Sequence, residues 1–213
     1  MMKIYFTLIC LCGSLAISGQ VYSQSLQSIS QGFSAHVHGQ FVRWNSNSFF
    51  LNDIASGDPS GVGFGVGLRY GFTSMMSGYL AFEGVNFNSN DEWERYNTKL
   101  YRFGGQYNFG GTTSRIRPYI HVGGVYQNFN LARIFINGTQ PVDNGKLTSK
   151  GFAVETGAGI RYHILPEFAA ELSISGQFGK YGSNFVNGQD YDFEETIDTQ
   201  HVFVRLGVGY FFY

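Results

Sequence analysis

The chain has 213 residues, with 14 lysines and arginines against 15 aspartates and glutamates, which gives a net charge of −1. This balance argues against nucleic acid as a partner, because nucleic-acid-binding domains need a basic face. The length suits one domain of moderate size. Glycine, with 29 residues, has about twice its usual ~7 % share, and aromatic residues reach 17 %. The fold has to explain both excesses.

Residues 1–23 are predicted to be a secretory signal peptide. Lys3 gives the segment a positive start, and residues 4–17 form an apolar core. Val21 and Ser23 occupy the −3 and −1 positions of a plausible cleavage site. A membrane anchor is the alternative, but this core is shorter than the ~20 residues that a helix needs to cross a bilayer. We therefore expect an exported protein.

Both cysteines of the chain, Cys10 and Cys12, lie within the predicted signal peptide. The mature chain would then have no cysteine, so neither disulfides nor cysteine metal sites are available to it.

Residues 33–43, FSAHVHGQFVR, alternate between apolar and polar side chains. Phe33 and Phe41 share one face, and His36 and His38 share the other. A period of two is typical of a β-strand with one apolar and one polar face.

Residues 61–72, GVGFGVGLRYGF, have a glycine at almost every second position. A dinucleotide-binding loop would need G-x-G-x-x-G, and no register of this segment fits that spacing. The alternation instead places one set of side chains on the same face: Val62, Phe64, Val66, Leu68, Tyr70 and Phe72. The opposite face carries Arg69 and otherwise glycine, so this predicted strand is apolar on one side and nearly bare on the other.

Six further segments show the same period. They are residues 78–87, 98–109, 117–128, 151–163, 168–179 and 200–212. Each has about ten residues or more, the length that a tilted strand needs to cross a bilayer.

The connections between these strands alternate in length. Short links fall at about 73–77, 110–116 and 164–167, and long polar links at about 44–60, 88–97, 129–150 and 180–199. Short turns on one rim and long loops on the other are typical of outer-membrane barrels. The sequence therefore predicts an all-β fold, an eight-stranded antiparallel up-and-down transmembrane β-barrel over residues 33–213, preceded by a short N-terminal segment at 24–32.

An internal repeat predicts which residues lie at the turn rim. GVGLRY at 65–70 and GAGIRY at 157–162 share G-x-G-[LI]-R-Y just before a short turn, and the glycine spacing recurs before Tyr210. Even-numbered strands of an up-and-down barrel end at the same rim. Tyr70, Tyr162 and Tyr210 are therefore predicted to form an aromatic girdle at the periplasmic rim.

With these features and its aromatic terminus, GYFFY, the chain resembles the small eight-stranded outer-membrane barrels of Gram-negative bacteria, the OmpA/OmpX-like and porin-family barrel-domain proteins. The resemblance implies location in the cell outer membrane, contact with outer-membrane lipid and lipopolysaccharide, and recognition by the outer-membrane assembly machinery. In such proteins that machinery reads a terminal aromatic residue. Here Phe212 ends the lipid-facing alternation and Tyr213 follows it, so both are candidates for the assembly signal.

The inward-facing positions include a predicted charge network. Its members are Arg69, Glu83, Arg102, Glu155, Arg161, Glu171 and Arg205. Opposite charges in a narrow lumen are expected to pair, because an isolated buried charge is very costly. An eight-stranded barrel has room inside only for side chains, so the inward neighbours of these long residues must be small, as glycine is. We favour a permanent filling of the lumen over a gate whose salt bridges switch.

The histidines offer two alternatives to simple filling. His36 and His38 project from one face and could contribute to a zinc site, but such a site needs a third ligand, so hydrogen-bonded filling is the favoured interpretation. A serine–histidine enzyme acting on lipid A needs its base beside the nucleophile. Only His163 and His201 lie near strand ends, and no H-x-S-N-like cluster occurs. We expect no cofactor and no enzymatic activity.

The long loops allow several interpretations. Residues 90–95 and 189–199 are acidic and aromatic, which fits a calcium site, an adhesive surface or plain solvation. Residues 131–138 include Leu131, Ile134, Phe135 and Ile136, which are apolar where solvent is expected. They either extend strands above the membrane and offer an edge to a partner, or pack on a neighbouring loop.

The predicted function is that of a non-enzymatic outer-membrane barrel with a filled lumen. Its role would be structural or adhesive, with the long loops as the contact surface for an extracellular protein partner. A narrow pore for small solutes or ions is the alternative, and a lipid A-modifying enzyme is a weaker one.

Overall fold

The structure is a computed structural model, and it describes residues 30–45, 60–87, 96–131, 135–136, 140–141, 146–190 and 197–212. The predicted signal peptide, Tyr213, the acidic segment 90–95 and parts of the predicted long loops lie outside the described residues. The predictions made for them stay predictions.

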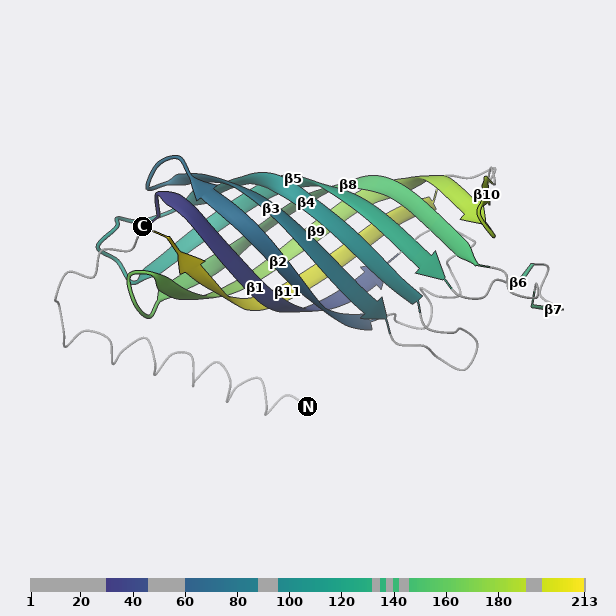
Figure 1. Cartoon of the computed structure of the whole chain (residues 1–213), viewed down its shortest axis with the longest axis horizontal. Helices are drawn as coiled ribbons and strands as arrows, with labels where there is room; N and C mark the ends of the chain where they lie inside the picture. The colour runs from purple at the N-terminus through teal and green to yellow at the C-terminus, as the bar shows by residue number, and fades with distance from the viewer. Residues whose placement is uncertain are drawn as a thin grey trace.

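Eight long strands form one closed antiparallel barrel, and they run obliquely to its long axis (Figure 1). They are β1 (Gly32–Asn45), β2 (Ser60–Gly71), β3 (Met76–Phe87), β4 (Tyr96–Asn108), β5 (Ile116–Leu131), β8 (Leu147–His163), β9 (Phe168–Val186) and β11 (Ile197–Phe211). Each pairs with its neighbour along the chain, and pairing of β1 with β11 closes the barrel. The predicted fold class is confirmed. No helix among the described residues is long and apolar enough to cross a membrane.

The two rims of the barrel differ as the connection lengths predict. Residues 72–75, 109–115 and 164–167 make short links at the rim where β1 begins and β11 ends, here the turn rim (Figure 1). Longer connections join the strands at the opposite, long-loop rim. There, β6 (Phe135–Ile136) and β7 (Gln140–Pro141) form a separate two-stranded sheet.

Several strands reach further towards the long-loop rim than predicted, so the predicted loops at 129–150 and 180–199 are too wide. β8 already begins at Leu147, and β9 continues to Val186. The chain then turns through Asn187 and Gly188, with φ of 53° and 82°, and returns as β10 (Gln189–Asp190). Positive φ at both positions is typical of a type I′ hairpin turn, and the Asn-Gly pair is its sequence signal.

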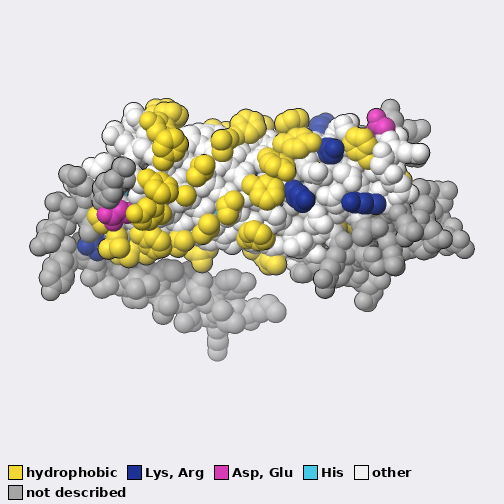
Figure 2. All heavy atoms as spheres, in the orientation of Figure 1, with side chains coloured by type: hydrophobic (Ala, Val, Ile, Leu, Met, Phe, Trp, Pro, Cys, Tyr) yellow, Lys and Arg dark blue, Asp and Glu magenta, His cyan; other side chains and the backbone are white. Residues whose placement is uncertain are grey.

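An apolar band covers the outer face of the barrel. Phe64, Leu80 and Leu206 are each about two-thirds exposed in the isolated chain, at 69 %, 65 % and 65 %. In Figure 2 hydrophobic side chains spread from the turn rim across the middle, and lysines and arginines gather towards the long-loop rim. This is the outer surface that a barrel in lipid requires.

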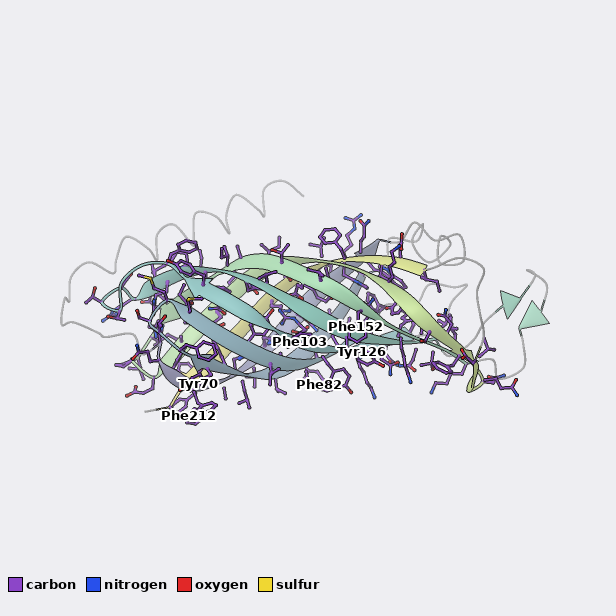
Figure 3. All side chains as sticks on the ribbon, turned by 90° about the horizontal axis from the view of Figure 1, so that it is seen from above. Tyr70, Phe82, Phe103, Tyr126, Phe152 and Phe212 are labelled. Carbon is purple, nitrogen blue, oxygen red and sulfur yellow. The ribbon has the colours of Figure 1, made fainter. Side chains whose placement is uncertain are left out.

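Aromatic side chains occur at two levels of this outer face (Figure 3). Tyr70 and Phe212 lie at the turn rim. Farther along, an outer aromatic row crosses four neighbouring strands, with ring centroids 5.1, 6.0 and 5.1 Å apart: Phe82, Tyr101, Tyr126 and Phe152. Aromatic girdles commonly mark the two interfaces of a membrane barrel.

Candidate functional site: the occluded lumen

The inner cluster lies towards the turn rim and consists of Arg69, Arg161 and Glu171. Arg69 donates from Nη1 and Nη2 to the two carboxylate oxygens of Glu171 at 2.9 and 3.0 Å, and Arg161 Nε donates to Oε1 of the same glutamate at 2.7 Å. The two arginines of the G-x-G-[LI]-R-Y repeat thus share one carboxylate. Bidentate arginine–carboxylate pairs are among the strongest hydrogen-bonded contacts in proteins.

The central cluster lies next along the lumen, nearer the middle of the barrel, and consists of Glu83, Arg102, Glu155 and Arg205. Arg102 donates to Glu83 Oε1 at 2.5 Å and to Glu155 Oε2 at 3.0 Å, and its Nη2 also contacts Glu155. Arg205 Nη2 lies 3.1 Å from an oxygen of each glutamate. Because each arginine bridges both glutamates, the cluster ties β3, β4, β8 and β11 together across the lumen. The two clusters contain all seven residues of the predicted charge network.

Histidines complete the central cluster. His38 Nε2 lies 3.0 Å from Glu83 Oε1, and His121 Nε2 lies 2.9 Å from Glu155 Oε1. The ring of His36 stacks on that of His38 with centroids 5.8 Å apart. Among the described residues, no group of three or more His, Cys, Asp or Glu could hold a metal ion.

Sequence reasoning missed one lumenal arginine, Arg117. Its side chain is fully buried, and its Nη2 donates to the backbone carbonyl of Ser74 at 2.6 Å while its Nη1 contacts Ser30. Arg117 has the same parity as His121 on β5, which was the available signal. With it, the described lumen holds five arginines and three glutamates, and therefore carries excess positive charge.

Inward-facing glycines leave space for rings that lie across the lumen. A Cβ added to Gly67 would come within 2.5 Å of the His36 ring, and one added to Gly159 within 2.5 Å of the Tyr119 ring. At both positions any side chain would displace a ring. Bulky neighbours thus explain the bare face at Gly65 and Gly67, where the nearest side chains are His38 and His36 rather than the arginines expected from the sequence. At Gly61, Gly63 and Gly71 an added Cβ would first meet a backbone oxygen.

A small cavity of about 50 Å³ lies between the two clusters, lined by His36, Arg69, Tyr79, Tyr119 and others. A cavity needs roughly 10–15 Å³ to hold one water molecule, so this one has room for a few. The Tyr79 hydroxyl and Arg69 Nε have no hydrogen-bond partner within the described protein, which makes the cavity polar and suited to water.

The half of the lumen nearer the long-loop rim, here the outer half, is filled by an aromatic plug that was not predicted from the sequence. Its members are Trp44, Phe87, Tyr96, Phe129, Tyr181 and Phe203, each no more than 3 % exposed. The indole of Trp44 packs on Phe129 at 5.3 Å and on Phe87 at 5.8 Å between ring centroids. Aliphatic side chains from these strands and from β8 complete the packing: Val42, Val85, Leu100, Val125, Leu131, Leu147 and Ile197. Leu131, an unexplained apolar residue of the predicted third long loop, belongs to this group.

The missed signal is the loss of alternation near the long-loop rim. Phe41–Val42, Leu100–Tyr101 and Val202–Phe203–Val204 are consecutive apolar residues. A strand that is buried on both faces shows such runs instead of alternation. Here one face meets lipid and the other meets the plug.

The predicted rim residues lie on the outer face. Tyr70, Tyr162 and Tyr210 are each between 42 % and 48 % exposed. Phe212 packs on Tyr210 at 5.2 Å, and its backbone N–H donates to the carbonyl of Phe33 at 2.9 Å. Their roles as girdle and assembly signal stay predictions.

Comparison with known proteins extends this description. The sequence matches no protein-family model and no curated protein. Among solved structures, Neisserial surface protein A (NspA) is similar with a TM-score of 0.59 and 14 % identity, over 85 % of this chain and 98 % of that one. The outer membrane protein OprG from Pseudomonas aeruginosa has a TM-score of 0.50 and 17 % identity, over 87 % and 98 %. The outer membrane enzyme PagL has a TM-score of 0.45 and 16 % identity, over 79 % and 97 %.

At these identities the likeness concerns the fold alone. The shared fold does not decide between an enzyme and a non-enzymatic barrel, so the predicted lack of enzymatic activity stays a prediction. The chain has the fold of the small eight-stranded β-barrels of the bacterial outer membrane.

Proposed function

We propose that the protein is a closed, non-enzymatic barrel of the outer membrane that acts through its long-loop end. The observation that carries this proposal is the filling of the lumen at two successive levels. The central cluster occupies one level and the aromatic plug the next, and no member of either is more than 7 % exposed.

A pore would need both levels to open. Opening the central cluster would separate buried charges from their partners, which is strongly unfavourable. Opening the aromatic plug would remove tightly packed rings from one another. The excess of positive charge in the lumen would also repel cations. These features favour a closed barrel over a cation-conducting pore.

Conductance of the purified, folded protein in a planar bilayer tests the closed state. We expect no steady channels from the natural protein, from Trp44→Ala or from Glu155→Ala, because each variant leaves one level intact. The double variant Trp44→Ala/Glu155→Ala is also expected to stay silent, because the inner cluster of Arg69, Arg161 and Glu171 still fills the lumen nearer the turn rim. Steady channels from the natural protein would overturn the proposal and favour the narrow pore.

A surface role is supported by the reach of the strands. β5, β8, β9 and β11 have 15–19 residues, whereas a membrane-crossing strand needs about 9–11. This excess supports a long-loop end that extends beyond the membrane and is accessible to an extracellular partner. NspA, which has a similar fold, is named a surface protein.

Loop replacement tests the surface role. Residues 88–95 and residues 191–196 can each be replaced by a short Gly-Ser turn, and adhesion of expressing cells to immobilised extracellular proteins can be measured. We expect at least one replacement to abolish adhesion while the barrel stays folded. Unchanged adhesion in both variants would contradict a role for these loops.

An enzyme acting on membrane lipid through a histidine base is less well supported. All five histidines of the chain lie on the lumenal side of their strands, away from lipid. We expect lipid A from cells with and without the protein to give the same mass spectrum. A change in its acyl chains would replace the non-enzymatic proposal.

A further inference from the structure

The outer face of the barrel has a groove where β9 is interrupted by a bulge. Lys150 of β8 pairs with Ser183, whereas the next residue, Gly151, pairs with Tyr181, so Gly182 is the extra residue on β9. A β-bulge bends its strand and changes the direction of the side chains that follow. Gly182 is exposed, and an added Cβ would meet nothing within 4 Å.

The groove at this bulge has a volume of about 650 Å³. This is within the ~300–1,000 Å³ typical of sites for small ligands. Its apolar walls come from Tyr126, Phe152, Val154, Phe178 and Phe185. Phe152 and Phe178 are 67 % and 56 % exposed in the isolated chain, so they present apolar surface to whatever fills the groove.

Two lysines border the same groove. Lys150 Nζ lies 4.9 Å from the centroid of the Phe185 ring, a cation–π contact that holds the ammonium group at the edge. Lys180 Nζ lies 3.4 Å from Asp198 Oδ1, an exposed pair of the kind that contributes little stability. Both ammonium groups are therefore beside the apolar walls, and a stronger anion can compete for them.

The groove lies at the level along the barrel where the membrane–water interface on the long-loop side is expected. Phe152 and Tyr126 belong both to its wall and to the outer aromatic row. Residue pairing connects Phe152 directly to Lys180 across β8 and β9. Figure 2 shows basic side chains towards the long-loop rim of the apolar band. If the long loops face outwards, as in the proposed function on which this placement rests, the groove opens to the outer leaflet.

We propose that this groove binds the lipid A part of lipopolysaccharide. One acyl chain lies along Phe152, Val154 and Phe178, and a phosphate group of the glucosamine headgroup lies between Lys150 and Lys180. Phosphate accepts charge-assisted hydrogen bonds from ammonium groups, and the apolar walls bury the chain. The ligand class is thus an acylated glycolipid with phosphate on its headgroup.

Native mass spectrometry of the folded barrel in detergent, with bis-phosphorylated lipid A as the probe, tests this site. The variant Lys150→Gln/Lys180→Gln is expected to bind lipid A about tenfold more weakly than the natural protein, since two charge-assisted contacts are lost. Lys99→Gln/Arg43→Gln is the matched control, because it removes two outward-facing cations of β4 and β1 that do not line the groove. We expect this control to bind within about twofold of the natural protein.

A second variant tests the apolar part of the site. Gly182→Leu introduces a side chain at the bulge without removing a charge, and it is expected to weaken lipid A binding while the barrel stays folded. Dephosphorylated lipid A and phosphatidylglycerol should both bind more weakly than lipid A.

Three results would overturn the proposal. Equal losses in the lysine double variant and in its control would mean diffuse charge attraction rather than a site. Equal binding of phosphatidylglycerol would exclude recognition of the glycolipid. A dimer that disappears with Gly182→Leu would assign the groove to a second copy of the chain. None of these results depends on whether the lumen conducts, so this proposal and the closed-lumen proposal can fail separately.

Discussion

The inner and outer halves of the lumen are closed by different chemistry. In the inner half, nearer the turn rim, the seven arginines and glutamates of the inner and central clusters form directional hydrogen bonds. Each glutamate bonds at least two arginines. In the outer half, buried aromatic and aliphatic side chains pack without fixed partners. One small lumen is therefore closed in two ways, and each way has its own weakness. Losing a side chain leaves an unpaired charge in the inner half and an empty space in the outer half.

The largest effect is expected in the outer half, for Trp44→Ala. The indole is 3 % exposed and contacts the rings of Phe87, Tyr96, Phe129 and His201. Removing a buried tryptophan commonly costs about 3–5 kcal/mol of unfolding free energy. Urea unfolding in lipid vesicles, followed by circular dichroism, measures the loss. Trp44→Phe is the control and should lose less than half as much. Equal losses in both variants would contradict packing as the source of stability.

A somewhat smaller loss, about 3 kcal/mol, is expected in the inner half for Glu155→Gln. The glutamate bonds Arg102, Arg205 and His121, and the amide leaves two buried guanidinium groups with Glu83 as their one carboxylate. The second variant, Glu155→Gln/Arg102→Gln, restores the charge balance of the central cluster. It should therefore be more stable than the sum of the two single losses indicates. Strict additivity in the same unfolding experiment would show that the charges do not act together.

The two halves also differed in how well the sequence predicted them. The inner half mostly follows clear alternation, so parity alone assigned Arg69, Arg102 and Arg161 to the lumen. In the outer half, Trp44, Phe129 and Tyr181 fall in segments that were interpreted as loops. Each is flanked by polar residues or glycine, so the apolar face there points into the lumen and the polar face outwards, the reverse of the pattern that marked the lipid-crossing strands.

Which arginine bonds which glutamate in the lumen could not be predicted from the sequence, for a different reason. Arg69 and Glu171 are 102 residues apart, and they meet only because the stagger of the strands brings them to one level. Register across a closed barrel depends on every strand in turn, whereas alternation is a local property. The strand face on which each residue lies could therefore be predicted, whereas its hydrogen-bond partner across the lumen could not.

A moderate loss, about 1–3 kcal/mol, is expected for Gly67→Ala in the inner half. The new methyl group would come within 2.5 Å of the His36 ring and 2.8 Å of the Leu80 carbonyl oxygen. Gly105→Ala is the matched control, because its outward-facing Cβ would meet nothing within 4 Å. The same unfolding experiment should give a change within about 0.5 kcal/mol for the control. Similar losses for both would mean that glycine acts through strand coiling rather than through space for the ring.

The smallest effect is expected outside the lumen, for Asp198→Asn. Asp198 and Lys180 form an ion pair of 3.4 Å, with side chains 53 % and 68 % exposed. An exposed pair of this kind contributes less than about 1 kcal/mol and is screened by salt. The pairs of the central cluster are shielded from solvent, so salt should leave them almost unchanged. Unfolding measured at low and high salt separates the two cases. We expect the small effect of Asp198→Asn to vanish at high salt, whereas that of Glu155→Gln persists. A loss for Glu155→Gln that also vanished would show that solvent ions reach the central cluster, and the lumen could then not be closed at that level.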